Sequence, residues 1–152
     1  MSCDSCAIKN LIYHYAHCLD GGDLEGVASL FLNGRIIAVS EDGSEFPIEG
    51  PEAVLALYRS FTRLYEDDGS PHTLHMTSNV LVDIAEGGLT ATSKSYALVF
   101  QALQGFPLQP IIGVRYFDRF DKGEQQAWRF SERRIDTRLK GDLSRHLLRA
   151  ME

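Results

Sequence analysis

Two histidines open a long alternating segment, at positions where small and apolar residues would be the ordinary choice. They are His72 and His75, in the stretch HTLHMTSN. An imidazole has an ordinary pKa of about 6.5, so it is the side chain best suited to accept a proton at neutral pH. A carboxylate on its second ring nitrogen would fix the tautomer and stabilise the cation that forms. We expect one of these rings to accept a proton in a small-molecule pocket, with its partner in the upstream stretch HCLDGG.

Within these stretches, His75 and Asp20 are the stronger candidates. His75 shares a strand face with Thr77 and Asn79, so a pocket on that side would have the imidazole directed into it. Asp20 falls in the last turn of a predicted helix, where the helix dipole disfavours a carboxylate by roughly 0.3–1 kcal/mol. A nearby cation or hydrogen-bond donor would explain its position. The alternatives are a histidine satisfied inside a core and a solvated helix end.

Other residues could complete such a pocket. Arg133 could hold a leaving oxygen, a halide or a carboxylate, although it could also be an exposed edge residue. Tyr15 could offer its hydroxyl to a ligand, although an aromatic residue at helical spacing is also typical of a core. The strand face with Ala97 and Val99 carries small side chains, which suits either a pocket for a flat ring or close packing against another subunit. We expect substrate contacts from Tyr15, Asn79, Ala97 and Val99.

The composition limits the partners of the chain. Its 152 residues are 44% hydrophobic, enough for one domain over residues 1–152 with a single sizeable core. The net charge of −6 and the lack of a long Lys/Arg cluster argue against nucleic acid and anionic membranes as partners. No leader and no apolar run long enough to span a membrane are recognised, so a cytoplasmic protein is expected.

No metal and no cofactor is expected. Cys3 and Cys6 have the C-x-x-C spacing of redox and zinc sites, but a zinc site would need two further ligands, such as His14 and His17. Free thiols at a helix start in a reducing cell are the favoured interpretation. The sequence contains no G-x-G-x-x-G, Walker or H-E-x-x-H motif.

The elements that must position these residues predict an α+β fold. Apolar residues recur at helical spacing over residues 7–19, Gly21 and Gly22 end that helix, and Asp23 caps a short second one. RIIAV and EFPIE predict a small hairpin, and Pro51 starts a third helix. Four long alternating segments then predict an antiparallel meander, and GDLSRHLLRA predicts a short terminal helix. Three helices covering a strongly curved sheet would leave a ligand pocket on its concave side.

These segments resemble the NTF2-like superfamily of cone-shaped, cystatin-like α+β domains, and in particular its SnoaL-like branch. The resemblance rests on YHYAHCLDGGDLEGVASLF, GPEAVLALY, HMTSNVLVDI and AWRFSERRI, and it covers residues 7–138. In two members, scytalone dehydratase and hexachlorocyclohexane dehydrochlorinase, an aspartate late in the first helix orients a histidine that abstracts a proton. The resemblance implies these roles for Asp20 and His75. It also places Arg133 where the dehydrochlorinase has an arginine.

Other pocket groups of these two relatives are missing. Val99, Gly113 and Ala38 occupy the places of a histidine, an asparagine and a tyrosine of the dehydratase. Tyr15 occupies the place of a lysine of the dehydrochlorinase. Neither relative's substrate is therefore transferred to this chain.

The resulting hypothesis is a cofactor-independent lyase of the dehydratase or dehydrohalogenase type. His75, oriented by Asp20, would remove a proton next to an activating group of a small cyclic or aromatic compound. Arg133 or Tyr15 would assist departure of the leaving group. The alternatives are an isomerase or polyketide-cyclase-like enzyme, and a non-catalytic ligand-binding or assembly module. The resemblance also implies a homo-oligomer, either a dimer or a trimer.

Overall fold

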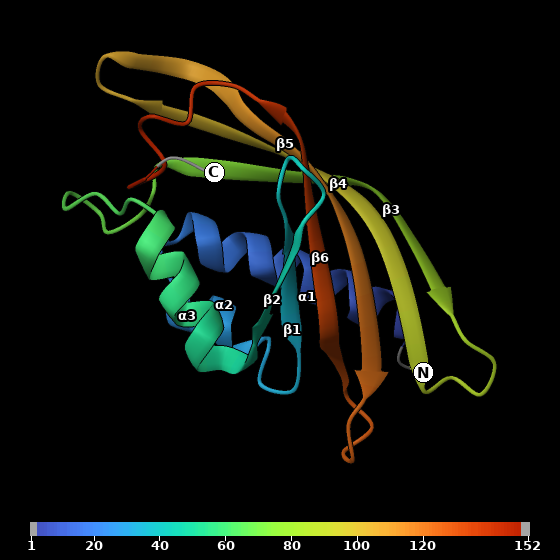
Figure 1. Cartoon of the computed structure of the whole chain (residues 1–152). Helices are drawn as coiled ribbons and strands as arrows, with labels where there is room; N and C mark the ends of the chain where they lie inside the picture. Colours follow the sequence, from blue (N-terminus) through green and yellow to red (C-terminus); the bar gives the residue numbers. More distant parts are fainter. Residues whose placement is uncertain (1–2, 150–152) are drawn as a thin grey trace.

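Three helices and six strands make up residues 3–149, the part of the chain that the computed structural model describes. The helices are α1 (Asp4–Asp20), α2 (Leu24–Ser29) and α3 (Gly50–Phe61). The strands are β1 (Arg35–Val39), β2 (Glu45–Glu49), β3 (Thr73–Ile84), β4 (Thr90–Leu103), β5 (Phe106–Lys122) and β6 (Trp128–Lys140). In Figure 1 the long strands bend around the helices, which lie on one side of the sheet. None of the helices in this part is long and apolar enough to cross a membrane.

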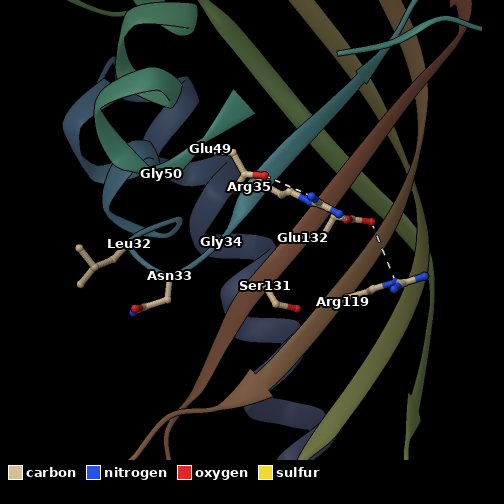
Figure 2. A pocket seen from close by; sticks show the side chains of 9 residues that line it. All are labelled: Leu32, Asn33, Gly34, Arg35, Glu49, Gly50, Arg119, Ser131 and Glu132. Carbon is tan, nitrogen blue, oxygen red and sulfur yellow. Dashed lines mark hydrogen bonds and ion pairs between the residues drawn. The ribbon is translucent and has the colours of Figure 1, made fainter. Parts of the chain in front are cut away.

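The six strands form one curved, unclosed sheet in the order β2-β1-β6-β5-β4-β3. The predicted hairpin and the predicted four-stranded antiparallel meander are both confirmed. The sheet is nevertheless mixed, because β1 pairs in parallel with β6. Parallel neighbours are joined by long connections, so no short turn signal in the sequence announces them. Arg35 on β1 faces Glu132 on β6 across this pairing, with 2.8 Å between Nη2 and Oε2. Figure 2 shows the two side chains next to each other.

The end of α1 is fixed by Gly22, whose left-handed conformation other residues rarely adopt. Gly22 has φ +75°, and a Cβ added there would lie 2.1 Å from the carbonyl oxygen of Gly69. The turn after α1 therefore touches the loop that leads into β3. This close approach brings the last residue of α1, Asp20, to the first residues of β3.

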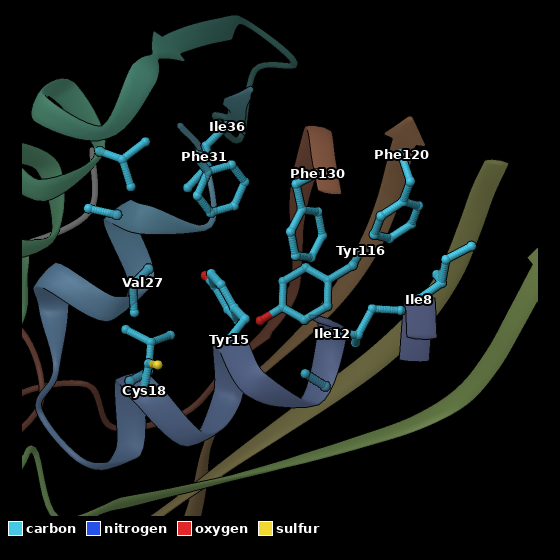
Figure 3. Close-up of a cluster of buried hydrophobic side chains, with 14 of the residues drawn as sticks. Ile8, Ile12, Tyr15, Cys18, Val27, Phe31, Ile36, Tyr116, Phe120 and Phe130 are labelled. Atoms are coloured by element: carbon cyan, nitrogen blue, oxygen red, sulfur yellow. The ribbon is translucent and has the colours of Figure 1, made fainter. Parts of the chain in front are cut away.

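Aromatic rings fill the core between α1, α2 and the sheet, as Figure 3 shows. Phe31 stacks on Phe130 with 5.2 Å between ring centroids. Tyr15 meets Tyr116 edge to face at 5.9 Å. Tyr15 thus belongs to the core, with its ring against Tyr116 of the sheet.

The inner face of β4 carries the predicted row of small side chains. Every second residue from Ala91 to Val99 is buried inside the described part of the chain. These residues therefore do not form the surface for another subunit that was the alternative interpretation. Their small volume leaves room on the concave side for the long side chains of α1 and β6.

A β-bulge interrupts β3 and corrects one prediction. The register with β4 shifts between Ser78 and Leu81, and Asn79 has the left-handed φ of +53°. Asparagine tolerates this conformation better than most residues. The bulge turns Asn79 outward, where it is exposed, so it does not share the inner face of His75.

The predicted terminal helix does not form. Residues 143–148, called the C-terminal strap below, run along the end of α3 instead, and Leu147 bridges to Thr62. The N–H of Leu148 donates to the carbonyl of Phe61 and the N–H of Arg63 donates to that of His146, both at 2.8 Å. Pairing with a distant segment satisfies backbone groups that a helix would have satisfied internally. Ala150, the last residue of the predicted helix, lies outside the described residues.

Candidate active site

Asp20 and His75, predicted as a pair, lie in direct contact. The Nδ1 atom of His75 is 2.6 Å from Oδ1 of Asp20. The backbone N–H of His75 donates to Oδ2 at 2.7 Å, and the hydroxyl of Thr73 donates to Oδ1 at 2.8 Å. Three donors from the start of β3 therefore hold one carboxylate at the end of α1.

The protonation of this pair follows from its contacts. Burial raises the pKa of the Asp20 carboxyl, but the hydrogen bonds from His75 and Thr73 outweigh it and hold the pKa below its ordinary value. An ionised carboxylate only accepts hydrogen bonds, so the shared hydrogen is on Nδ1 of His75. The lone pair of the neutral ring is then on Nε2, which is the nitrogen able to take a proton.

A cavity of about 160 Å³ opens beside His75. The wall includes aliphatic side chains from β4, β5, β6 and the C-terminal strap, and Val99 is one of them. The polar groups on the wall include His75, Tyr15, Tyr58 and His146. An apolar cavity of about 150 Å³ is large enough to bind benzene, so this space suits a single-ring compound.

Two tyrosines on the cavity wall share a hydrogen bond. Tyr15 on α1 and Tyr58 on α3 are hydrogen-bonded to each other through their oxygens. Burial raises the pKa of both hydroxyls, so both keep their hydrogens at neutral pH. Only one hydrogen is used in the bond between them. The other is left to donate to a ligand or to a departing group.

Arg133 does not lie on the cavity wall. Its side chain is fully buried and makes a two-pronged ion pair with Asp118, with Nε–Oδ1 and Nη2–Oδ2 distances of 2.8 Å. The guanidinium carbon lies 4.2 Å from the ring centre of Tyr15 and 3.9 Å from that of Tyr116. Asp118 binds two of its nitrogens, whereas Nη1 is buried without a hydrogen-bond partner in the described chain. Arg133 therefore lies behind the wall and is neither an exposed edge residue nor in contact with the cavity.

Two further predicted contacts are not brought to the cavity. Ala97 is buried on the inner face of β4 but is not part of the wall. Asn79 is exposed beyond the bulge. Of the four predicted substrate-binding residues, Tyr15 and Val99 line the cavity. The bulge turns Asn79 away from the inner face, whereas Ala97 lies on that face outside the cavity wall, and alternation alone could reveal neither.

Sequence reasoning missed several polar residues of the wall, among them Tyr58, Tyr116 and His146. The helical spacing of Tyr58 within α3 is typical of a core residue and gives no reason to separate it from its apolar neighbours. His146 lies in the C-terminal strap, which no periodic pattern connects to β3. A single histidine in a polar tail carries no local signal. Only the folding of that tail across the end of α3 brings it to His75.

Other clusters that the sequence suggested are less suited to a ligand. The exposed thiols of Cys3 and Cys6 do not meet the two histidines, and His14 instead approaches Cys18, at 3.6 Å. Asp67 and Asp68 lie close to His72 at the surface, and Nε2 of His72 is 2.8 Å from Asp67 Oδ1. The two carboxylates and the imidazole therefore pair with one another.

A wider groove of about 580 Å³ lies near the start of β1. Figure 2 shows that its charged side chains pair among themselves. Arg35 contacts Glu49 at 3.1 Å as well as Glu132, and Arg119 contacts Glu132 at 4.0 Å. This groove therefore offers a ligand fewer unpaired polar groups than the cavity beside His75 does.

Comparison with known proteins identifies the fold and the family. The SnoaL-like domain family matches residues 1–134. No curated protein matches the chain. An NTF2-like protein with a cystatin-like fold from Novosphingobium aromaticivorans aligns with a TM-score of 0.70 and 21% identity over 93% of this chain and 85% of its own.

Two other solved structures from the same organism are similar. A candidate scytalone dehydratase aligns with a TM-score of 0.68 and 23% identity over 91% of this chain and 86% of its own. A candidate aromatic ring hydroxylase aligns with a TM-score of 0.70 and 21% identity over 95% of this chain and 99% of its own. At these identities the structures show a shared fold, while the family match spans most of the sequence. The chain belongs to the SnoaL-like family and has the NTF2-like, cystatin-like fold.

Proposed function

We propose that this protein is a cofactor-independent lyase that uses the His75–Asp20 pair as a general base on a small cyclic or aromatic compound. The observation that carries the proposal is the contact between Asp20 and Nδ1 of His75 at the edge of an apolar cavity. Membership of the SnoaL-like family, together with a candidate scytalone dehydratase among its structural neighbours, supports an enzyme that modifies small molecules.

The proposed reaction begins with proton transfer from a carbon of the substrate to Nε2 of His75. The electrons of the C–H bond form a carbon–carbon double bond, and the leaving group departs from the adjacent carbon with its bonding pair. Asp20 stabilises the imidazolium that forms, because its carboxylate already holds the other ring nitrogen. A departing hydroxide takes its proton from this imidazolium, whereas a halide leaves as the anion.

The tyrosine pair is proposed to assist the leaving group. The free hydrogen of Tyr15 or Tyr58 donates to the departing oxygen or halide, where negative charge develops. Arg133 contributes its charge from behind the Tyr15 ring, without touching the substrate. The apolar wall excludes water, which strengthens both interactions.

The proposal is tested with a panel of single-ring alcohols, halides and ketones incubated in D₂O. Loss of the carbon-bound proton and appearance of products are followed by NMR spectroscopy. We expect at least one compound to lose a proton together with its leaving group, and His75→Ala to abolish the reaction. Product formation that survives His75→Ala would reject the mechanism. His72→Ala is the matched control, because this histidine is outside the cavity and its loss leaves the reaction intact.

The same measurement separates elimination from isomerisation. An isomerase would return the proton to another carbon and release neither water nor halide. A non-catalytic binding module would leave every compound of the panel unexchanged.

A further inference from the structure

His146 is a second imidazole on the wall of the cavity that holds His75. Its Nδ1 atom is inaccessible to solvent and has no hydrogen-bond partner among residues 3–149. A buried polar atom without a partner destabilises a fold, and such atoms are few in native proteins. Because water does not reach Nδ1, a ligand in the cavity would meet the remaining part of the ring, where Nε2 can take part in a hydrogen bond.

The C-terminal strap that carries His146 is fixed in place from two sides. On one side, the carbonyl of His146 accepts from the N–H of Arg63. On the other, the buried amide of Gln101 donates to the carbonyl of Arg145 at 3.1 Å and to that of Pro71 at 2.9 Å. Pro71 leads into β3, the strand of His75. Gln101 thus joins the strap to the strand that bears the proposed base, and the imidazoles of His75 and His146 keep a fixed relation.

The surroundings of His146 keep its ring neutral. Burial and the neighbouring His75 lower the pKa of His146 to about 4, against an opposing effect of Asp20. A neutral imidazole donates one hydrogen bond and accepts another, so at neutral pH it can polarise an oxygen without giving up its proton.

We propose that His146 is a second catalytic residue, which binds the substrate oxygen next to the carbon that loses its proton to His75. The assignment rests on the proposed function of His75 and narrows its substrate class. The substrate is a single-ring compound with a carbonyl or similar acceptor oxygen beside an acidic C–H bond. As His75 takes the proton, the C–H electrons form a carbon–carbon double bond and the carbonyl electrons move onto oxygen. The N–H of His146 stabilises that oxygen. When the leaving group departs from the next carbon with its bonding pair, the oxygen electrons re-form the carbonyl and the double bond moves to the two carbons that lost the proton and the leaving group.

The test compares two probes of similar shape, cyclohexanone and methylenecyclohexane. Only cyclohexanone has an acceptor oxygen. Their affinities are measured by NMR titration for the natural protein, His146→Leu and His146→Gln. We expect His146→Leu to weaken cyclohexanone binding by about fivefold and to leave methylenecyclohexane binding unchanged or tighter. His146→Gln retains a donor, so it restores most of the cyclohexanone affinity.

Several outcomes would overturn the assignment. One is an equal loss of affinity for both probes in His146→Leu, which would indicate a packing role. Others are unchanged cyclohexanone binding in that variant and no binding of either probe by the natural protein. Thermal unfolding provides a second readout. Removal of an unpartnered nitrogen should leave the melting temperature of His146→Leu equal or raised, whereas a structural histidine would lower it.

Failure of the proposed function remains distinguishable from failure of this inference. Exchange of the α-protons of cyclohexanone in D₂O reports on His75, and His75→Asn should abolish it. Affinity for cyclohexanone reports on His146, and His75→Asn should leave the difference between the two probes intact. If neither the natural protein nor any variant exchanges the α-protons of cyclohexanone, the role of His75 on ketones is contradicted. The affinities for the two probes would still decide the role of His146.

Discussion

Asp20 stands where an isolated carboxylate is disfavoured, at the negative end of α1. The three hydrogen bonds from Thr73 and His75 offset this cost and explain why the residue is acceptable there. A carboxylate that is tolerated only because of its partners indicates a site selected for its chemistry. His146 is the opposite case, because its buried Nδ1 has no partner in the described chain to offset the cost of burial.

Asp20→Asn should separate orientation from folding. The amide keeps the size of the carboxylate but removes its charge and presents a donor to Nδ1 of His75, which favours the wrong tautomer. We expect kcat/KM to fall by about 10²–10⁴-fold with little change in KM. Steady-state kinetics on a substrate found in the panel measures this. Full activity of the Asp20→Asn variant, with an intact fold by circular dichroism, would contradict the pairing.

The neutral state of His146 predicts an acid-sensitive fold. Its pKa is lowered to about 4 in the folded protein, whereas the unfolded chain has the ordinary value of about 6.5. The unfolded state therefore binds the proton first, and stability is lost as the pH falls from about 6.5 to about 4. The full effect is about 3 kcal/mol.

Urea denaturation at pH 7 and pH 4 measures this loss. The free energy of unfolding of His146→Gln should fall less than that of the natural protein, because the contribution of His146 is absent. Carboxyl groups such as Asp20 titrate in both proteins and largely cancel in the comparison. An identical loss in the two proteins would show that His146 titrates normally.

The buried pair of Arg133 and Asp118 predicts a large effect on stability. Replacing Asp118 by Asn leaves a guanidinium in the core without a countercharge. We expect a loss of about 3–5 kcal/mol in the free energy of unfolding, measured by urea denaturation. Asp121→Asn is a matched control, since its ion pair with Arg129 is partly exposed, and a loss below about 1 kcal/mol is expected. Equal losses of unfolding free energy in Asp118→Asn and Asp121→Asn would mean that burial does not make the first ion pair more important for stability than the second.

At the scale of elements, the junction between α1 and β3 positions the catalytic pair. Gly22→Ala should test it, because an added Cβ would clash with the carbonyl oxygen of Gly69. We expect the backbone to shift at Asp20, so that activity falls along with stability. Gly87→Ala is the matched control, because Gly87 also has a left-handed φ, +93°, but a Cβ there meets open space.

The two glycine variants are compared by thermal unfolding and by kcat. Gly87→Ala should cost about 1–2 kcal/mol of stability and leave kcat unchanged at a temperature where the protein is folded. Gly22→Ala should lower kcat at that same temperature. Equal kcat values in the two variants would show that the α1 end does not set the geometry of Asp20.

At the scale of the whole molecule, an apolar row crosses the outer face of the sheet. Met76 pairs with Leu98, Leu98 with Gly113 and Gly113 with Leu139, and the three large side chains are exposed. Gly113 has no side chain, which lets Leu139 lie across its strand. We propose that a second copy of this chain covers the row, because four adjacent strands contribute to it and homodimer interfaces are more apolar than ordinary surfaces.

Leu98→Asp tests this interface at its centre. We expect the variant to be monomeric in analytical ultracentrifugation at concentrations where the natural protein is a dimer or a trimer. Leu32→Asp is the control, since Leu32 is exposed but lies outside the row. Sedimentation of the natural protein as a monomer would contradict the proposed interface.

Local patterns in the sequence predicted most of the elements. The hairpin segments RIIAV and EFPIE are the strands β1 and β2, and α3 begins at Gly50 with Pro51 in its first turn. The four long strands appear in the predicted order. These features depend on periodicity and turn residues, which neighbouring residues supply by themselves. The resemblance to the SnoaL-like family added the expectation that Asp20 faces His75.

Contacts between distant segments decided the rest. The parallel pairing of β1 with β6, the bulge at Asn79 and the C-terminal strap have no signature in the residues that form them. The cavity wall, with its Tyr15–Tyr58 pair and His146, exists only where these segments meet. The sequence alone determined which residues could do chemistry. Whether they share one cavity depends on long-range packing, because a local pattern fixes the face of a residue but not what that face will meet.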